Sequence, residues 1–163
     1  MATGKTTVGK LVAAHLKRAF VDTDALIEKR QGLSIPEIFA KFGESAFRQM
    51  ERDIALELSK RKNLVISTGG RLLLDPTNKI ALSENGLIFC LVASPEVILA
   101  RLQNDGDSNR PLLNVPNPQK QILELLRERE KGYQNFVHIS TDDKQPSEVV
   151  DKILQHINNT SIN

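Results

Sequence analysis

The chain begins with residue types that are typical of phosphate binding. Gly4, Lys5 and Thr6 match the last three positions of the pattern G-x-x-x-x-G-K-[ST], known as the P-loop. In such a loop, backbone N–H groups and the start of a helix face phosphate oxygens. Lys5 would contact the β- and γ-phosphates of a nucleotide, and the Thr6 hydroxyl would bind Mg²⁺. The first glycine of the pattern would precede Met1. Taken alone, this half-motif is therefore better explained by chance or by an ordinary helix start than by a P-loop.

Two carboxylates follow the first apolar run of the chain. Asp22 and Asp24 come directly after Ala19-Phe20-Val21, which is typical of a strand. A carboxylate near Thr6 could hold Mg²⁺ directly or through water, and a second could accept a proton from an attacking hydroxyl. The alternative is that Asp22 or Thr23 caps the following helix. One residue can do both.

Three arginines are candidates for binding anionic groups. Arg48 belongs to an amphipathic helix, Arg110 to a polar loop and Arg129 to a charged helical segment. The alternative for Arg48 and Arg129 is a solvated helix face. An arginine in a loop such as Arg110 can instead close over a triphosphate. His138 and His156 have no partners at metal-ligand spacing, so we interpret both as structural or exposed.

Composition indicates an ordinary globular protein. The 163 residues are enough for one domain with a sizeable core, and a net charge of +2 indicates neither a nucleic-acid nor a membrane partner. The only cysteine of the sequence, Cys90, lies in an apolar run, so a reducing cytoplasm is the default. No apolar run approaches the roughly 20 residues of a membrane helix, and we expect no signal peptide.

Short apolar runs alternate with helical periodicity from end to end. Strands are expected at 19–21, 64–66, 87–92 and 137–139, and helices at 5–17, 25–31, 34–43, 45–60, 76–84, 94–102, 119–131 and 146–157. The polar segment 104–118 is expected to be a mobile lid, and 158–163 a flexible tail. This alternation predicts an α/β protein with three α/β/α layers, in which a parallel sheet carries helices on both faces. Ligands then bind at the carboxyl ends of the strands.

Together, these motifs resemble the shikimate kinase family, small P-loop kinases of the nucleoside-monophosphate-kinase type. The resemblance covers the chain from Ala2 to about Ile157, as one domain over residues 1–157. It rests on these motifs in order: Gly4-Lys5-Thr6-Thr7-Val8-Gly9-Lys10, Asp22-Thr23-Asp24, Gly43-Glu44, Phe47-Arg48 with Glu51, Arg110-Pro111-Leu112-Leu113, and Arg129 with Tyr133.

The resemblance implies ATP-dependent phosphorylation of the 3-hydroxyl of shikimate in aromatic amino-acid biosynthesis. It implies that Asp24 holds the substrate hydroxyls and is the candidate base. Arg48 and Arg129 would bind the shikimate carboxylate, a task that suits the planar guanidinium. Gly70 would present its backbone N–H to the substrate. The implied partners are shikimate and ATP, without nucleic acid or membrane, for a monomeric cytoplasmic protein.

The resemblance also implies a nucleotide site with Mg²⁺ as cofactor. The segment Ala2, Thr3, Gly4, Lys5, Thr6 and Thr7 would bind ATP, with Lys5 on the phosphates. Thr6 would bind the metal, and Asp22 would support it through water. Arg110 would close from the lid onto the nucleotide. Lys144 matches the adenine-side turn more loosely, and stacking of Arg101 on adenine is the weakest of these expectations.

Two features depart from the family pattern. Arg71 stands where the glycine turn usually has its third glycine. If that position had positive φ, arginine would cost roughly 1 kcal/mol or more, and its side chain could add an anion contact or block the acceptor pocket. The first strand and the first P-loop glycine are also absent, so we expect that the sequence is an incomplete version of a gene product. Loss of that central strand would leave two strand edges unpaired.

Two alternatives remain open at the level of sequence. The first is a kinase of the same fold with another acceptor, such as gluconate, which Arg71 motivates and the two carboxylate-binding arginines oppose. The second is a non-catalytic binding protein that resembles shikimate kinase. The half P-loop and Arg71 motivate this second alternative, whereas the retained catalytic side chains oppose it.

Overall fold

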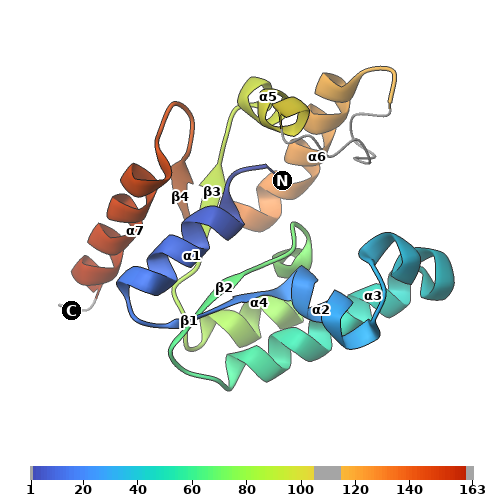
Figure 1. Ribbon diagram of the computed structural model, residues 1–163, viewed down its shortest axis with the longest axis horizontal. Coiled ribbons are helices and arrows are strands. Elements are labelled where there is room, and N and C mark those ends of the chain that lie inside the picture. The colour runs from blue at the N-terminus through green and yellow to red at the C-terminus, as the bar shows by residue number, and fades with distance from the viewer. Residues whose placement is uncertain (1, 105–114, 161–163) are drawn as a thin grey trace. The chain divides into compact units, whose positions relative to one another are not determined.

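The structure is a computed structural model that describes residues 2–104 and 115–160. Its contacts divide the chain into two compact units. One unit is Thr6–Ile88, and the other joins Met1–Lys5 to Phe89–Asn163. Figure 1 shows the elements of both, and each unit is described by itself. The single domain expected from the sequence stays a prediction.

The Thr6–Ile88 unit contains a parallel pair of strands with helices. Its elements are α1 (Lys5–His15, whose first residue belongs to the other unit), β1 (Ala19–Asp22), α2 (Thr23–Gln31), α3 (Ile35–Ser59), β2 (Leu64–Ser67), the 3₁₀ helix η1 (Leu72–Leu74) and α4 (Pro76–Ser83). In the pair, Asp22 lies opposite Ser67, so β1 and β2 end at the same edge. The residues that follow the two strands therefore begin next to each other, at the carboxyl ends of β1 and β2.

Apolar side chains of α2 and α3 form the core of this unit. Its buried members are Ile27, Ile38, Phe47, Ile54 and Leu58. The strands add Val21, Leu64 and Ile66 to this cluster. On α3, Phe47, Ile54 and Leu58 follow Gly43 at helical spacing, so this part of the helix packs along one face.

Helix α3 consists of two helical segments that meet at a break at Gly43, where the sequence predicts the end of one helix before the next. It begins with the expected capping box, in which the Glu37 carboxylate accepts hydrogen bonds from Ser34 N at 2.7 Å and Ser34 Oγ at 2.6 Å. Gly43 has φ 80° and ψ 171°, which interrupts the helical backbone. Positive φ is readily available only to glycine, so the residue type explains the position of the kink.

The other unit contains a second parallel pair. Its elements are β3 (Phe89–Val92), α5 (Pro95–Asn104), α6 (Pro118–Tyr133), β4 (Val137–Ser140) and α7 (Pro146–Thr160). Val92 lies opposite Ser140 in the pair. A core cluster of Ile98, Leu102 and Ile122 joins α5 to α6, and Ala2 packs against it.

The strands of the described residues form two separate pairs, β1 with β2 and β3 with β4. Within these pairs each strand has one neighbour, so the single sheet expected from the sequence is present as two two-stranded sheets. All four strands are parallel to their partners, as the alternation of strands and helices predicts. The two unpaired strand edges expected beside the absent central strand stay a prediction.

Several element boundaries differ from those expected. Helix α7 continues to Thr160, so residues 158–160 of the expected tail are helical, and Thr160 Oγ1 donates a hydrogen bond to His156 O at 2.8 Å in this last turn. Strand β3 begins at Phe89, two residues after the expected start. The 3₁₀ helix at Leu72–Leu74 was not expected. Residues 105–114 of the expected lid lie outside the described residues.

In residues 2–104 and 115–160, no helix is long and apolar enough to cross a membrane.

Candidate active site

Thr6 and Asp22 lie side by side in the Thr6–Ile88 unit. Thr6 Oγ1 donates a hydrogen bond to Asp22 Oδ2 at 3.0 Å. The other carboxylate oxygen, Oδ1, accepts from the backbone N–H groups of Asp24 at 3.1 Å and Ala25 at 3.3 Å. Asp22 is therefore the N-cap of α2, as the alternative interpretation held. Because capping uses only Oδ1, Oδ2 and the Thr6 hydroxyl form a pair of oxygen atoms suited to a hard cation.

Asp24 lies against the glycine turn that follows β2. A Cβ atom added to Gly69 would lie 2.4 Å from Asp24 Oδ1 and 3.2 Å from its Cγ. Thr23, which is fully buried, accepts a hydrogen bond from Gly69 N at 3.0 Å through Oγ1. These contacts hold the start of α2 against the Gly69–Gly70 turn. The structure thus brings together the two polar clusters that the sequence places at strand ends.

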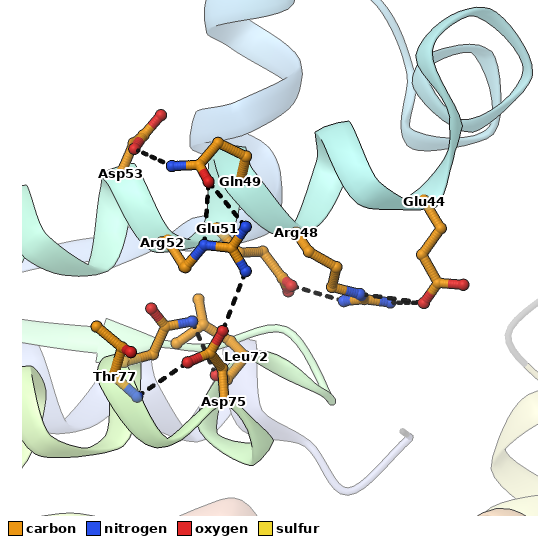
Figure 2. A network of polar contacts seen from close by, with 10 residues as sticks. Glu44, Arg48, Gln49, Glu51, Arg52, Asp53, Leu72, Asp75 and Thr77 are labelled. Atoms are coloured by element: carbon orange, nitrogen blue, oxygen red, sulfur yellow. Dashed lines mark hydrogen bonds and ion pairs between the residues drawn. The ribbon is translucent and has the colours of Figure 1, made fainter.

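Arg48 lies on α3 between two glutamates, as Figure 2 shows. Its Nη1 donates to Glu51 Oε2 at 2.6 Å, and its Nε and Nη2 donate to Glu44 Oε1 at 3.2 and 3.1 Å. The Glu51 side chain is only 3% exposed, whereas that of Glu44 is 56% exposed. Arg48 is therefore not the freely solvated arginine of the alternative interpretation.

Burial controls the charge state of Glu51. Loss of hydration raises the pKa of the Glu51 carboxyl, and the hydrogen bond and positive charge of Arg48 oppose that shift without cancelling it. The positive charge of Arg71 opposes it as well. Arg71 has φ −123°, an ordinary value, so the strain considered for arginine at this position is absent.

A second polar network joins α3 to the start of α4. Arg52 Nη1 donates to Asp75 Oδ2 at 3.2 Å, and Asp75 Oδ1 accepts from Thr77 N at 2.9 Å as the N-cap of α4 (Figure 2). Asn78, which is buried, donates from Nδ2 to Leu72 O at 3.0 Å. These bonds anchor the segment that directly follows the glycine turn.

In the other unit, Arg101 joins Ala2 to the end of β4. Its Nη1 donates to Thr141 Oγ1 at 2.9 Å and to Ala2 O at 3.2 Å, and its Nη2 donates to Thr141 O at 2.7 Å. Thr141 is buried and bonds through its N–H to Val92 O at 2.8 Å. Nearby, Lys144 Nζ contacts Asp142 O at 3.5 Å. The Ala2 and Lys144 segments therefore both meet the carboxyl ends of β3 and β4.

The remaining candidates are divided between the units. Within the candidate phosphate-binding segment, Thr3 is buried, Gly4 has φ 79°, and Thr7 lies in the first turn of α1. Lys5 and Arg129 belong to the Phe89–Asn163 unit, whereas Thr6, Gly70 and Arg48 belong to the other. The structure therefore describes Arg48 and Arg129 each within its own unit, and their joint role stays a prediction.

One further candidate is not placed by the structure. Arg110 lies outside the described residues. No cluster of three or more histidine, cysteine, aspartate or glutamate side chains suited to a metal occurs among residues 2–104 and 115–160.

Sequence reasoning assigned no role to Glu44 or Glu51, although it noted both. The available signal was their spacing, since residues four before and three after Arg48 share its helix face. Thr141 was missed entirely. Its partner Arg101 lies 40 residues away, a separation at which no local pattern operates.

The helices, the parallel strands and a Gly-Lys-Thr segment that opens α1 define a P-loop kinase of the α/β class. A profile of the family described as "Shikimate kinase" matches residues 1–158. The chain belongs to the shikimate kinase family, and it is accordingly an enzyme of the phosphotransferase class. The shikimate kinase of Caldanaerobacter subterraneus subsp. tengcongensis is 47% identical over 156 residues, which are 95% of this chain and 90% of that protein. The shikimate kinase of Thermodesulfovibrio yellowstonii is also 47% identical, over 95% of this chain and 89% of that protein.

Solved structures agree with this assignment. The structure of shikimate kinase from Acinetobacter baumannii in complex with shikimate has a TM-score of 0.87 at 38% identity and covers all of this chain and 91% of its own. Shikimate kinase from Bacteroides thetaiotaomicron also has a TM-score of 0.87, at 29% identity, over 97% of this chain and 94% of its own. A gluconokinase from Sinorhizobium meliloti has a TM-score of 0.64 at 16% identity over 98% of this chain and 88% of its own, which shows a shared fold alone.

Proposed function

We propose that this chain transfers the γ-phosphoryl group of ATP to the 3-hydroxyl of shikimate. One observation carries the proposal. The hydrogen-bonded pair of Thr6 with Asp22 and the contact of Asp24 with Gly69 both lie at the carboxyl ends of β1 and β2. Phosphoryl transfer needs a metal-binding group and a group that orients the attacking hydroxyl close together. Asp22 and Asp24, two residues apart, meet that need.

Thr6 and Asp22 fit a role in holding Mg²⁺. Their two oxygen atoms are 3.0 Å apart, and Mg²⁺ prefers oxygen ligands and retains water when it binds nucleotide phosphates. In this proposal Thr6 binds the ion and Asp22 supports it through water. The ion would neutralise charge on the phosphates of ATP.

In the proposal, the acceptor contacts two side chains that bind its carboxylate and two groups beside its 3-hydroxyl. Asp24 orients the 3-hydroxyl and accepts its proton, and the backbone N–H of Gly70 binds the acceptor beside it. Arg48 binds the acceptor carboxylate with Arg129 as second arginine. The Arg48 guanidinium suits this role because the buried Glu51 already restricts its orientation.

The nucleotide is held by the first residues of the chain. In the proposal, backbone groups from Ala2 to Thr7 bind the phosphates, Lys5 stabilises the transferred group, and Arg110 closes onto it. Lys144 lies on the adenine side.

In the same proposal, the protein acts as a monomeric cytoplasmic enzyme, with residues 1–157 as one domain.

The test is ADP release by the 163-residue chain with ATP and Mg²⁺, with and without shikimate, together with calorimetry of shikimate binding. We expect release that depends on shikimate, and Arg48→Ala should abolish the binding of shikimate. Arg30→Ala is the matched control. Like Arg48, Arg30 forms an ion pair with a glutamate, here Glu57 at 2.7 Å, but both side chains of this pair are exposed. If the folded chain neither binds shikimate nor releases ADP in its presence, the proposal is wrong.

A further inference from the structure

Arg48 is held by two carboxylates that differ sharply in exposure. Glu51, 3% exposed, accepts one short hydrogen bond at 2.6 Å from Nη1. Glu44, 56% exposed, accepts two longer ones at 3.2 and 3.1 Å from Nε and Nη2. The buried carboxylate is a permanent support, because releasing it would leave a charge without water. The exposed carboxylate can exchange its partner for water at little cost.

The atoms that Glu44 occupies form the edge with which an arginine binds carboxylates. Nε and Nη2 point in parallel, so they can donate two hydrogen bonds to one carboxylate group. In Figure 2 the Glu44 carboxylate lies against this edge, on the side of Arg48 away from Glu51. An acidic ligand that is to bind Arg48 through both atoms must therefore displace Glu44.

The backbone at this point favours such a displacement. Glu44 directly follows Gly43, whose φ of 80° interrupts α3. A Cβ atom at Gly43 would meet nothing within 4 Å, and Phe42 and Glu44 on either side are exposed. Among the described residues, Arg48 holds the Glu44 side chain through these hydrogen bonds, and they are the ones a ligand would replace.

We propose that Glu44 is an internal competitor for the carboxylate of the acceptor and sets the affinity of the site for acidic acceptors. The inference rests on the proposed function, in which Arg48 binds the shikimate carboxylate. A planar carboxylate replaces both hydrogen bonds of Glu44, whereas a neutral group does not. Glu44 therefore lowers the affinity for the correct acceptor and keeps Arg48 paired in its absence.

The main experiment measures the binding of shikimate, and of its methyl ester, to wild type and Glu44→Gln by calorimetry. We expect Glu44→Gln to bind shikimate about two- to fivefold more tightly, or about 0.4–1 kcal/mol, with kcat and Tm unchanged. Binding of the methyl ester should not change, because it cannot replace a charged carboxylate. Glu57→Gln is the matched control on the same helix, since it removes the exposed pair with Arg30, and it should leave both affinities unchanged.

Equal or weaker binding of shikimate by Glu44→Gln would overturn the inference and make Glu44 neutral or a support for Arg48. A second measurement separates this failure from failure of the proposed function. Acetate is titrated while the Arg48 Nε–H signal is followed by NMR, with assignment from its loss in Arg48→Lys. A larger response in Glu44→Gln than in wild type supports competition even if neither protein binds shikimate, and equal responses contradict it.

Discussion

Gly69 lacks a side chain at the point where the Asp24 carboxylate needs the space. A Cβ atom there would lie 2.4 Å from Asp24 Oδ1, and the Gly69 N–H meanwhile donates to the buried Thr23 Oγ1 at 3.0 Å. Because the contacted oxygen is the end of a side chain, a larger residue would rotate the Asp24 carboxylate out of its present position. The glycine turn therefore positions the candidate base.

Gly69→Ala tests this relationship. We expect the new methyl group to displace Asp24 and to reduce kcat about 100-fold or more, because a shift of about 1 Å in a reacting group can have that effect. Gly32→Ala is a control for stability, because Gly32 has φ +64° with nothing within 4 Å of an added Cβ. It should destabilise the fold by about 1 kcal/mol with kcat retained. Normal kcat in Gly69→Ala would show that Asp24 does not have the proposed role.

Asp22→Asn separates capping from metal support. Asparagine caps helices as well as aspartate does, so the hydrogen bonds to Asp24 N and Ala25 N should persist and Tm should change little. Loss of the charge beside Thr6 should weaken Mg²⁺ binding, so that about 10–100-fold more Mg²⁺ is needed for the same activity. The measurement is the Mg²⁺ concentration for half-maximal ADP release. An unchanged value would limit Asp22 to its capping role.

Asp75 should stabilise the protein in a pH-dependent manner. Burial opposes its charge, but hydrogen bonds from Thr77 N and Arg52 leave the pKa of Asp75 below its ordinary value of 3.8. Its stabilising effect is therefore complete above pH 3.8 and is lost as the pH falls through the lowered pKa. Asp75→Asn keeps a cap and should cost up to about 1 kcal/mol at neutral pH, the range for partly exposed pairs.

Asp75→Ala should cost about 1 kcal/mol more at neutral pH, because the helix cap is lost as well. Denaturant unfolding from pH 2.5 to 7 measures both variants. The difference between wild type and Asp75→Asn should shrink toward acid pH. A difference that grows toward acid pH would contradict the assigned direction of the pKa.

Arg71→Gly tests whether this position prefers glycine. Because Arg71 has φ −123°, glycine relieves no strain and instead makes the unfolded chain more flexible. We expect a loss of about 0.4–1 kcal/mol in the free energy of unfolding. The KM for shikimate decides its functional role, since a rise indicates an anion contact and a fall indicates a side chain that obstructs the acceptor. A more stable Arg71→Gly protein would contradict the absence of strain.

Local sequence patterns predicted much of the fold. Strand and helix order follows from periodicity, and the helix ends follow from short-range bonds such as Glu37 to Ser34 and Asp22 to Ala25. The Gly43 kink and the Gly32 stop follow from a residue type that tolerates positive φ. Strand pairing does not follow from local patterns, because partners such as Ala19 and Leu64 are distant in the chain, and the described strands form two pairs in place of the one sheet expected.

Residue order alone shows which chemical groups are present and on which elements they lie: the Gly-Lys-Thr segment at the start of α1, the aspartates around the end of β1 and the arginine of α3. Which of these groups meet depends on the folded chain. Gly69 and Thr23 are 46 residues apart, and Arg101 and Thr141 are 40 apart. Even Arg48, whose partners are local, required burial to distinguish the fixed Glu51 from the exposed Glu44. Spacing determines which side chains can reach one another, but their energies depend on surrounding water, which only packing removes.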